Sequence, residues 1–121
     1  MRQFKELIIR KPKPYRSAQL ELNGKWLDGL GFSIGTHVNA YFNEGCLFLS
    51  TDPTSRNDFA VLVVNPKRVR GRVRPQLLID GYMVRRLGYR INDRLGLVLE
   101  RGKIQIMKIN HPTTEERDCF D

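Results

Sequence analysis

The feature of this 121-residue sequence that most constrains its fold is an internal repeat. Residues 19–50 align with residues 76–107 at a shift of 57 positions, and seven of the 32 pairs are identical. The retained positions are glycines and periodically spaced apolar residues, which are the ones that a shared backbone requires. Neither unit has enough apolar surface to fold alone, so the repeat predicts two tandem units around one core. The identical pairs are Gln19/Gln76, Leu20/Leu77, Gly24/Gly81, Leu30/Leu87, Gly31/Gly88, Ile34/Ile91 and Gly45/Gly102.

Each unit has the same expected order of elements. An apolar strand comes first, a basic arm follows, and a short alternating strand leads into about two turns of helix. Asn23 and Asp80 are suitable N-cap residues, and Gly31 and Gly88 stand where a helix end favours positive φ. A hairpin closes each unit. The expected strands are 4–9, 19–22, 59–64 and 76–79, with hairpin turns at 43–45 and 100–102.

These elements predict a mostly β fold with two short helices, in which two tandem repeats close one barrel and leave no exposed strand edge. We expect a single domain over residues 1–121. Within it, residues 4–50 form the first repeat, residues 59–108 form a second, basic repeat, and residues 109–121 form an acidic tail.

Composition excludes several classes of protein. The chain is 40% hydrophobic and 28% charged, which is unlike a disordered chain. Its apolar runs are too short to cross a bilayer, and its N-terminus has no apolar signal core. We therefore expect no membrane association and a cytoplasmic location. Cys46 and Cys119 match no metal-ligand spacing and are interpreted as thiols.

The positive charge of the chain is concentrated in its second half. There are 21 lysine and arginine residues against 13 acidic ones, giving a net charge of +8. Residues 17–50 contain one basic residue and three acidic ones, whereas residues 75–108 contain seven basic and three acidic residues. Lys67 to Arg74 adds five basic residues and no acidic one. This pattern predicts a polyanionic partner on the second repeat.

Two motifs in the first repeat resemble a known family. The segments Leu20-Glu-Leu-Asn-Gly-Lys-Trp-Leu-Asp-Gly-Leu-Gly-Phe and Glu44-Gly-Cys-Leu-Phe-Leu are similar to those of the SymE-type toxin family. The resemblance covers roughly residues 4–50. It implies the AbrB-like swapped-hairpin fold, in which two copies interleave as one barrel, usually in a homodimer. It also implies a toxin that represses translation, with an RNA-cleaving activity attributed to the family.

The second repeat departs from that pattern and is more basic. Trp26, Cys46 and Glu44 are replaced by Met83, Lys103 and Arg101. The segment Val84 to Gly88 is instead similar to the arginine-bearing helix of AbrB-type DNA binders. The resemblance therefore implies a pseudo-dimer whose two units come from one chain, either as a monomer or as a homodimer.

The sequence does not display a catalytic constellation. Cleavage of RNA at a ribose 2′-hydroxyl needs a His or Glu base, and His37 and His111 are the only histidines. His37 is interpreted as a solvent-facing strand residue. Glu44, which matches the family's E-G-C motif, is the one carboxylate that we single out, with a polar turn residue as the alternative. We expect no metal site and no cofactor.

Binding residues are more abundant than catalytic ones. Arg68, Arg70, Arg72 and Arg74 alternate, so as one extended arm they would point the same way, with Val69 and Val73 toward the barrel. Arg85 and Arg86 are expected on the exposed side of a short helix, and Tyr15 stacks on a base or covers the barrel end. Trp26 is expected in the core. The predicted nucleic-acid-binding residues are Lys11, Lys13, Arg16, Lys67, Arg68, Arg70, Arg72, Arg74, Arg85, Arg86, Arg90 and Arg94.

The sequence thus predicts a nucleic-acid-binding protein, a SymE-like toxin or regulator that binds DNA or RNA through its second repeat and basic arms. Two alternatives remain open. One is an RNA endonuclease toxin. The other is a protein-interaction module, such as an antitoxin or inhibitor, with an acidic or nucleic-acid-processing partner.

Overall fold

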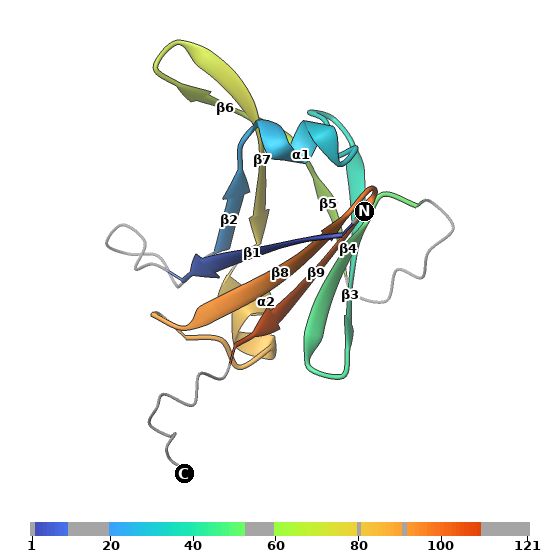
Figure 1. The fold of residues 1–121 in the computed structure, drawn as a ribbon, viewed down its shortest axis with the longest axis vertical. Helices are drawn as coiled ribbons and strands as arrows, with labels where there is room; N and C mark the ends of the chain where they lie inside the picture. The colour runs from blue at the N-terminus through green and yellow to red at the C-terminus, as the bar shows by residue number, and fades with distance from the viewer. Residues whose placement is uncertain (1, 10–19, 53–59, 80, 91, 110–121) are drawn as a thin grey trace.

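A computed structural model describes residues 2–9, 20–52, 60–79, 81–90 and 92–109 of the chain. Over these residues the fold is mostly β, as predicted, with short helices at two places (Figure 1). No helix in this part of the chain has the length and apolar character needed to cross a membrane. The elements are β1 (Gln3–Ile8), β2 (Leu20–Asn23), α1 (Lys25–Gly29), β3 (His37–Asn43), β4 (Cys46–Ser50), β5 (Ala60–Val63), β6 (Asn65–Val69), β7 (Arg72–Ile79), α2 (Gly81–Arg86), β8 (Arg94–Glu100) and β9 (Lys103–Lys108).

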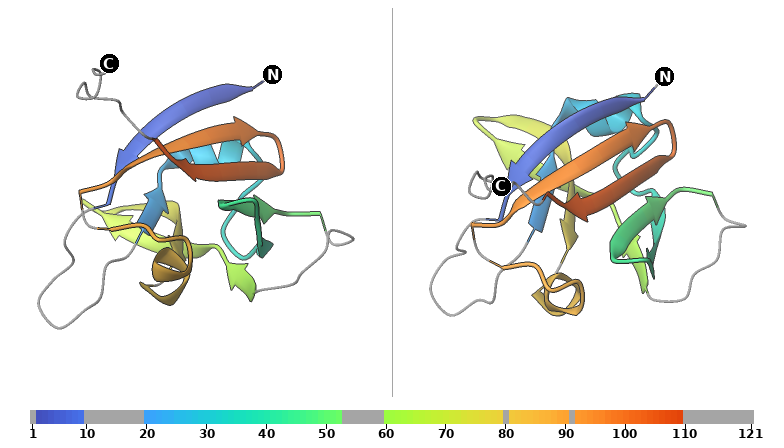
Figure 2. Two further views of the ribbon diagram at one scale, coloured as in Figure 1. Left: turned by 90° about the horizontal axis from the view of Figure 1, so that it is seen from below. Right: turned by 60° about the horizontal axis from the view of Figure 1, so that its bottom comes forward.

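The strands form two antiparallel sheets. One has six strands in the order β1-β8-β9-β4-β3-β5, and the other has three strands in the order β2-β7-β6. The first strand of the chain pairs with the last hairpin, β1 with β8, and β5 pairs with the first hairpin through β3. Strands that are far apart in the sequence therefore lie side by side (Figure 2). Closure of the two sheets into one barrel stays a prediction.

In two of the strand pairs, the pairing relates residues of the first half to their counterparts 57 positions later. In the β2–β7 pair, Leu20 lies opposite Ile79 and Leu22 lies opposite Leu77. In the β4–β9 pair, the centre is Phe48 opposite Gln105. In each pair, a residue and its counterpart 57 positions later therefore occupy equivalent places on the two paired strands.

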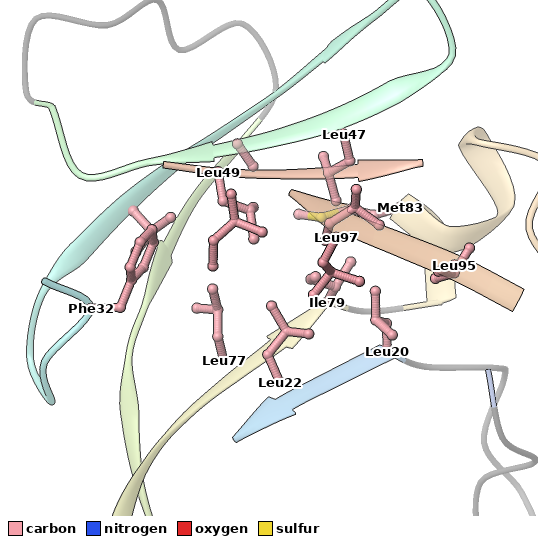
Figure 3. Close-up of a cluster of buried hydrophobic side chains, with 14 of the residues drawn as sticks. Leu20, Leu22, Phe32, Leu47, Leu49, Leu77, Ile79, Met83, Leu95 and Leu97 are labelled. Carbon is pink, nitrogen blue, oxygen red and sulfur yellow. The ribbon is translucent and has the colours of Figure 1, made fainter. Parts of the chain in front are cut away.

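The core lies between the two sheets (Figure 3). Leu22 of β2 and Leu77 of β7 are fully buried, and the close-up shows them facing Leu49 of β4 and Leu97 of β8. Along β2, and along most of β4 and β7, buried residues alternate with more accessible ones because successive side chains of a strand point to opposite faces. Burial of one such leucine stabilises the fold by roughly 1.5–3 kcal/mol.

Glycines end both helices, as predicted. Gly31 has a φ of 91° and Gly88 a φ of 76°, a region that an L side chain adopts only with strain. After each glycine the chain turns back, so that the Phe32 amide donates to the Leu27 carbonyl, at 2.8 Å. The Tyr89 amide donates to the carbonyl five residues earlier, at 3.0 Å, in the same way.

The predicted start of the first helix is wrong. The N-cap is Gly24 rather than Asn23, and no side chain caps the helix. Asn23 stays in the β2–β7 ladder, where its side chain donates to Glu21 instead. Asp80, the expected cap of the second helix, lies outside the described residues.

Trp26 lies at the margin of the core rather than within it. Its ring is half-buried against the core, and its indole N–H donates to the Asn23 carbonyl at 3.0 Å. Gly24 makes room for this ring, because a Cβ at Gly24 would stand only 2.7 Å from Trp26 Cδ1. The need to satisfy the indole N–H keeps the ring near the strand end.

Candidate nucleic-acid interface

The basic segment around residue 70 is a β-hairpin that projects from the body of the protein (Figure 1). Strands β6 and β7 pair from Asn65 opposite Gln76 to Val69 opposite Arg72. Arg70 and Gly71 form the turn, with φ values of 51° and 78°. Two successive positive φ values define a type I′ turn, whose twist matches that of the flanking strands. We call Asn65–Gln76 the basic ribbon.

This turn corrects the prediction of one extended arm. Arg68 lies opposite Val73, whereas Arg74 lies opposite Lys67. Paired residues share a face of the ribbon, and neighbours along a strand alternate, so Arg68 lies on the opposite face from Arg72 and Arg74. The predicted inward position of Val73 is also wrong, since this side chain is 47% exposed. The period-two pattern holds within each strand, but it does not continue through a turn.

The ribbon therefore carries positive charge on both faces and at its tip. Arg68, Arg70 and Arg72 are exposed, and Arg74 is half-buried. No acidic residue occurs anywhere between residues 60 and 79. Because an exposed guanidinium forms bidentate hydrogen bonds with phosphate oxygens, this surface suits a polyanionic backbone.

The base of the ribbon is held by a carboxylate from β2. Glu21 Oε2 forms an ion pair with Lys67 Nζ, and it accepts hydrogen bonds from Gln76 Nε2 at 3.0 Å and Asn23 Nδ2 at 2.7 Å. Partial burial raises the pKa of Glu21, but the hydrogen bonds from Lys67, Gln76 and Asn23, with the charge of Lys67, together hold it below its ordinary value. Lys67, a predicted binding residue, is thus engaged in anchoring the ribbon.

The arginines of α2 lie near the first hairpin. Arg85 and Arg86 are exposed, as predicted, and Arg86 Cζ stands 5.5 Å from the ring centroid of Phe42 in β3. Phe42 comes two residues before Glu44, which is exposed in the left-handed conformation at a φ of 52°. The structure thus brings an arginine of the second half beside the hairpin that carries the candidate carboxylate.

The remaining predicted residues are placed differently. Arg94 forms an ion pair with Glu6 of β1, at 3.8 Å, so part of its charge is neutralised within the protein. Arg90, four residues earlier in the sequence, is exposed. His37 is exposed at the start of β3, as predicted. Within the described ranges no group of three or more His, Cys, Asp and Glu residues could hold a metal ion. Lys11, Lys13, Tyr15, Arg16 and His111 lie outside those ranges.

The sequence prediction does not include an aromatic pair on the six-stranded sheet. Tyr41 of β3 lies opposite Phe48 of β4, and the two rings stack with centroids 5.1 Å apart and planes 9° from parallel. Lys103 Nζ of β9 stands 5.3 Å from the Phe48 ring centroid. The signal in the sequence is that Phe48 stands between Leu47 and Leu49, which are buried, so that its own ring must face outward.

The fold and this surface define a class: a mostly antiparallel β protein with a projecting basic hairpin. No family model matches the chain, and no solved structure matches it. The chain is similar over a limited length to curated proteins, and this bears out the family resemblance in a distant and partial form.

The chain is 35% identical to Endoribonuclease SymE of Shigella flexneri over 49 aligned residues. The aligned residues make up 40% of this chain and 43% of that protein. The figures are the same for Toxic protein SymE of Escherichia coli strain K12. With Endoribonuclease SymE of Escherichia coli O6:K15:H31, strain 536, it shares 39% identity over 44 residues, which is 36% of this chain and 39% of that protein. The chain thus spans less than half the length of these relatives.

Proposed function

We propose that this protein binds RNA as a SymE-like toxin and that the basic ribbon contacts the RNA phosphates. The observation that carries the proposal is the ribbon itself, with Arg68, Arg70 and Arg72 exposed on a projecting hairpin that is anchored at its base by Glu21. The choice of RNA over DNA is supported by the relatives, whose names describe an endoribonuclease and a toxic protein.

The physical basis of this binding is counterion release. Each arginine or lysine that neutralises a phosphate displaces a condensed cation, so the affinity falls as salt rises. Because the ribbon has arginines on both faces, it can contact the phosphates of two RNA segments, or of two parts of one bent RNA strand. The deep, narrow major groove of A-form RNA is closed to a protein ribbon, so we expect contact with backbone phosphates.

The test is a titration with single-stranded RNA, duplex RNA and duplex DNA at about 50 and 200 mM salt. Arg72→Ala should reduce the slope of log affinity against log salt by about 1 for RNA. Lys25→Ala removes the same charge from an exposed position on α1 and should leave the slope unchanged. Absence of salt-sensitive binding to either RNA would contradict the proposal, and it would favour the protein-interaction alternative.

RNA cleavage is the second candidate function, and it is favoured by the similarity to proteins named endoribonuclease together with the placement of Glu44 and Arg86. The Glu44 carboxylate would take the proton of a ribose 2′-hydroxyl, and the resulting 2′-oxygen would attack the adjacent phosphorus. The bond to the 5′-oxygen breaks, that oxygen takes up a proton from water, and a 2′,3′-cyclic phosphate remains. Arg86 would stabilise the extra negative charge of the transition state.

Cleavage is tested with Glu44→Gln, which keeps the shape of the side chain and removes its basicity. We expect a loss of about 10²–10⁴-fold in cleavage rate with unchanged RNA affinity. Glu6→Gln is the control, because Glu6 is paired with Arg94 on a different strand. Cleavage that survives in Glu44→Gln would exclude this residue as the base.

We also infer that the chain is an internal duplication that forms a pseudo-dimer by itself. Equivalent hydrogen bonds in the two halves support this. The Ile9 amide donates to the Asp93 carbonyl at 3.0 Å, and the Val64 amide donates to the Thr36 carbonyl at 3.0 Å. Sedimentation should then give the mass of one 14.1 kDa chain. A dimer in dilute solution would contradict a self-sufficient single chain. The cytoplasmic location and an antitoxin partner stay predictions.

A further inference from the structure

The outer face of the six-stranded sheet carries a continuous row of side chains. Phe4 of β1 lies opposite Val98 of β8, Val98 opposite Gln105 of β9, Gln105 opposite Phe48 of β4, and Phe48 opposite Tyr41 of β3. We call these five residues the outer row. Four spacings between neighbouring strands give it a length of roughly 19 Å.

The outer row stands on the opposite side of the sheet from the core. Leu47 and Leu49, which flank Phe48, are fully buried, as are Ile104 and Ile106, which flank Gln105. Because neighbours along a strand point to opposite faces, the row points away from the core. Its end at Phe4 is 59% exposed.

The stacked rings of Tyr41 and Phe48 stabilise the sheet, but stabilisation does not explain why the Lys103 cation lies beside them. A stacked cross-strand pair such as Tyr41 and Phe48 stabilises a sheet by itself. The cation of Lys103 beside the Phe48 ring adds a charge that an apolar partner surface would have to desolvate. Parallel rings with a flanking cation, on a sheet, instead match what unpaired nucleotides need: a π-face for the base and a positive charge for the phosphate.

We propose that the outer row, centred on Tyr41 and Phe48, binds the unpaired bases of single-stranded RNA by stacking, with Lys103 at the adjoining phosphate. The proposal rests on the proposed function, because it specifies which part of an RNA this chain recognises. Only unpaired bases expose their faces, so the row distinguishes single strands from duplexes. The ribbon contributes charge to either kind of RNA.

The experiment compares Phe48→Ala and Tyr41→Ala with Phe48→Tyr, which keeps an aromatic ring. Met107→Ala is the matched control, because Met107 is a half-buried residue on the same outer face of β9. The probes are a fluorescein-labelled short oligouridylate and a blunt RNA duplex, followed by fluorescence anisotropy. Thermal unfolding of every variant checks that the fold is retained.

Phe48→Ala should weaken binding of the oligouridylate by roughly 5- to 150-fold, the range of one lost base stack. Binding of the duplex should change less than about twofold, and Phe48→Tyr and Met107→Ala should bind like the parent protein. The loss from Phe48→Ala should persist at high salt, because stacking involves no counterion release, whereas the effect of Arg72→Ala should shrink.

Several results would overturn the proposal. Unchanged oligouridylate binding in folded Phe48→Ala and Tyr41→Ala would exclude the row while leaving the ribbon, and hence RNA binding, intact. Equal losses on oligouridylate and duplex would exclude stacking as the cause. A parent protein that is dimeric and an alanine variant that is monomeric would assign the row to contacts between copies. A parent protein that binds neither RNA would instead overturn the proposed function itself.

Discussion

The hairpins β3–β4 and β8–β9 differ on their outer faces and agree on their inner ones. Leu47 and Leu49 of the first correspond to Ile104 and Ile106 of the second, and all four are buried. On the outside, Tyr41 and Phe48 of the first hairpin correspond to Val98 and Gln105, and Cys46 corresponds to Lys103. Packing therefore restrains the residues between the sheets, whereas the outer positions carry different chemistry in the two hairpins.

A second contrast lies at the centre of the β2–β7 pair. Glu21 and Leu78 lie opposite each other, yet Glu21 binds Lys67 and Gln76, whereas Leu78 is 37% exposed. The first half thus provides the acid that anchors the ribbon, and the second half provides the ribbon. The two opposite positions of this strand pair are therefore complementary rather than alike.

The largest change in stability is expected at the buried faces of the hairpins β3–β4 and β8–β9, and it tests whether these faces pack alike. Leu49→Ala and Ile106→Ala, at corresponding positions of the two hairpins, should each lower the free energy of unfolding by about 2–5 kcal/mol, because both side chains are fully buried and each substitution leaves a cavity. Urea unfolding of the two variants measures this. Costs that differ by more than about 2 kcal/mol would show that the two core positions are not equivalent in packing.

The next effect tests the difference in charge between the halves. Arg85→Ala/Arg86→Ala should weaken RNA binding roughly tenfold at low salt, since two cations are lost from α2. The corresponding residues of α1 are Asp28 and Gly29, and Asp28→Ala should leave binding unchanged or slightly stronger. Fluorescence anisotropy with one RNA probe compares the two variants. Equal effects would show that the arginines of α2 do not contribute to RNA binding.

A smaller effect concerns the anchor of the ribbon. Glu21→Gln should destabilise the protein by at most about 1 kcal/mol at neutral pH, because the pair with Lys67 is about one-third exposed and screened by solvent. The pKa of Glu21 is lowered in the folded state. Its contribution is therefore complete above the unfolded pKa of about 4.3 and is lost as the pH falls through the lower folded value.

Unfolding of the parent protein and of Glu21→Gln from pH 7 down to pH 3 measures this contribution. The difference in stability between the two proteins should shrink toward the acid end. A difference that is constant over this range would show that the charge of Glu21 does not support the ribbon. Leu78→Ala, on the other side of the strand pair, should show no such pH dependence.

The smallest effect is expected from a substitution that gives the first hairpin an outer residue of the second. Phe48→Gln places on β4 the residue that stands at the corresponding position of β9. The unfolding free energy should fall by only about 0.2–1 kcal/mol, the value of one cross-strand pair. Thermal denaturation measures it. A much larger loss would mean that the stack is part of the core and not a surface available to a ligand.

Much of the fold follows from local patterns in the sequence. The alternation in residues 94–99 predicts a strand, and Gly31 and Gly88 mark the ends of both helices where the backbone turns left-handed. These features depend on a few neighbouring residues, so they can be read without knowledge of the partners. Asn23 shows the limit, because pairing with Gln76 keeps it in a strand and moves the helix cap to Gly24.

The candidate site was less predictable because its geometry depends on pairing. The segment Arg68 to Arg74 has an arginine at every second position on both sides of Gly71, and it therefore resembles one strand. Only the left-handed turn at Arg70 and Gly71 separates the arginines onto two faces. The stack of Tyr41 on Phe48 depends likewise on the register between two strands, and the Lys103 contact depends on a third.

Local sequence is sufficient to specify the strands, the short helices, the glycine turns and the excess of positive charge in the second half. These follow from side-chain periodicity, backbone freedom and composition, which are properties of short segments. Tertiary structure decided which strands are neighbours, which face each arginine occupies and which aromatic rings meet. Those outcomes depend on burying one shared core between two sheets, and distant parts of the chain must pair before any such contact exists.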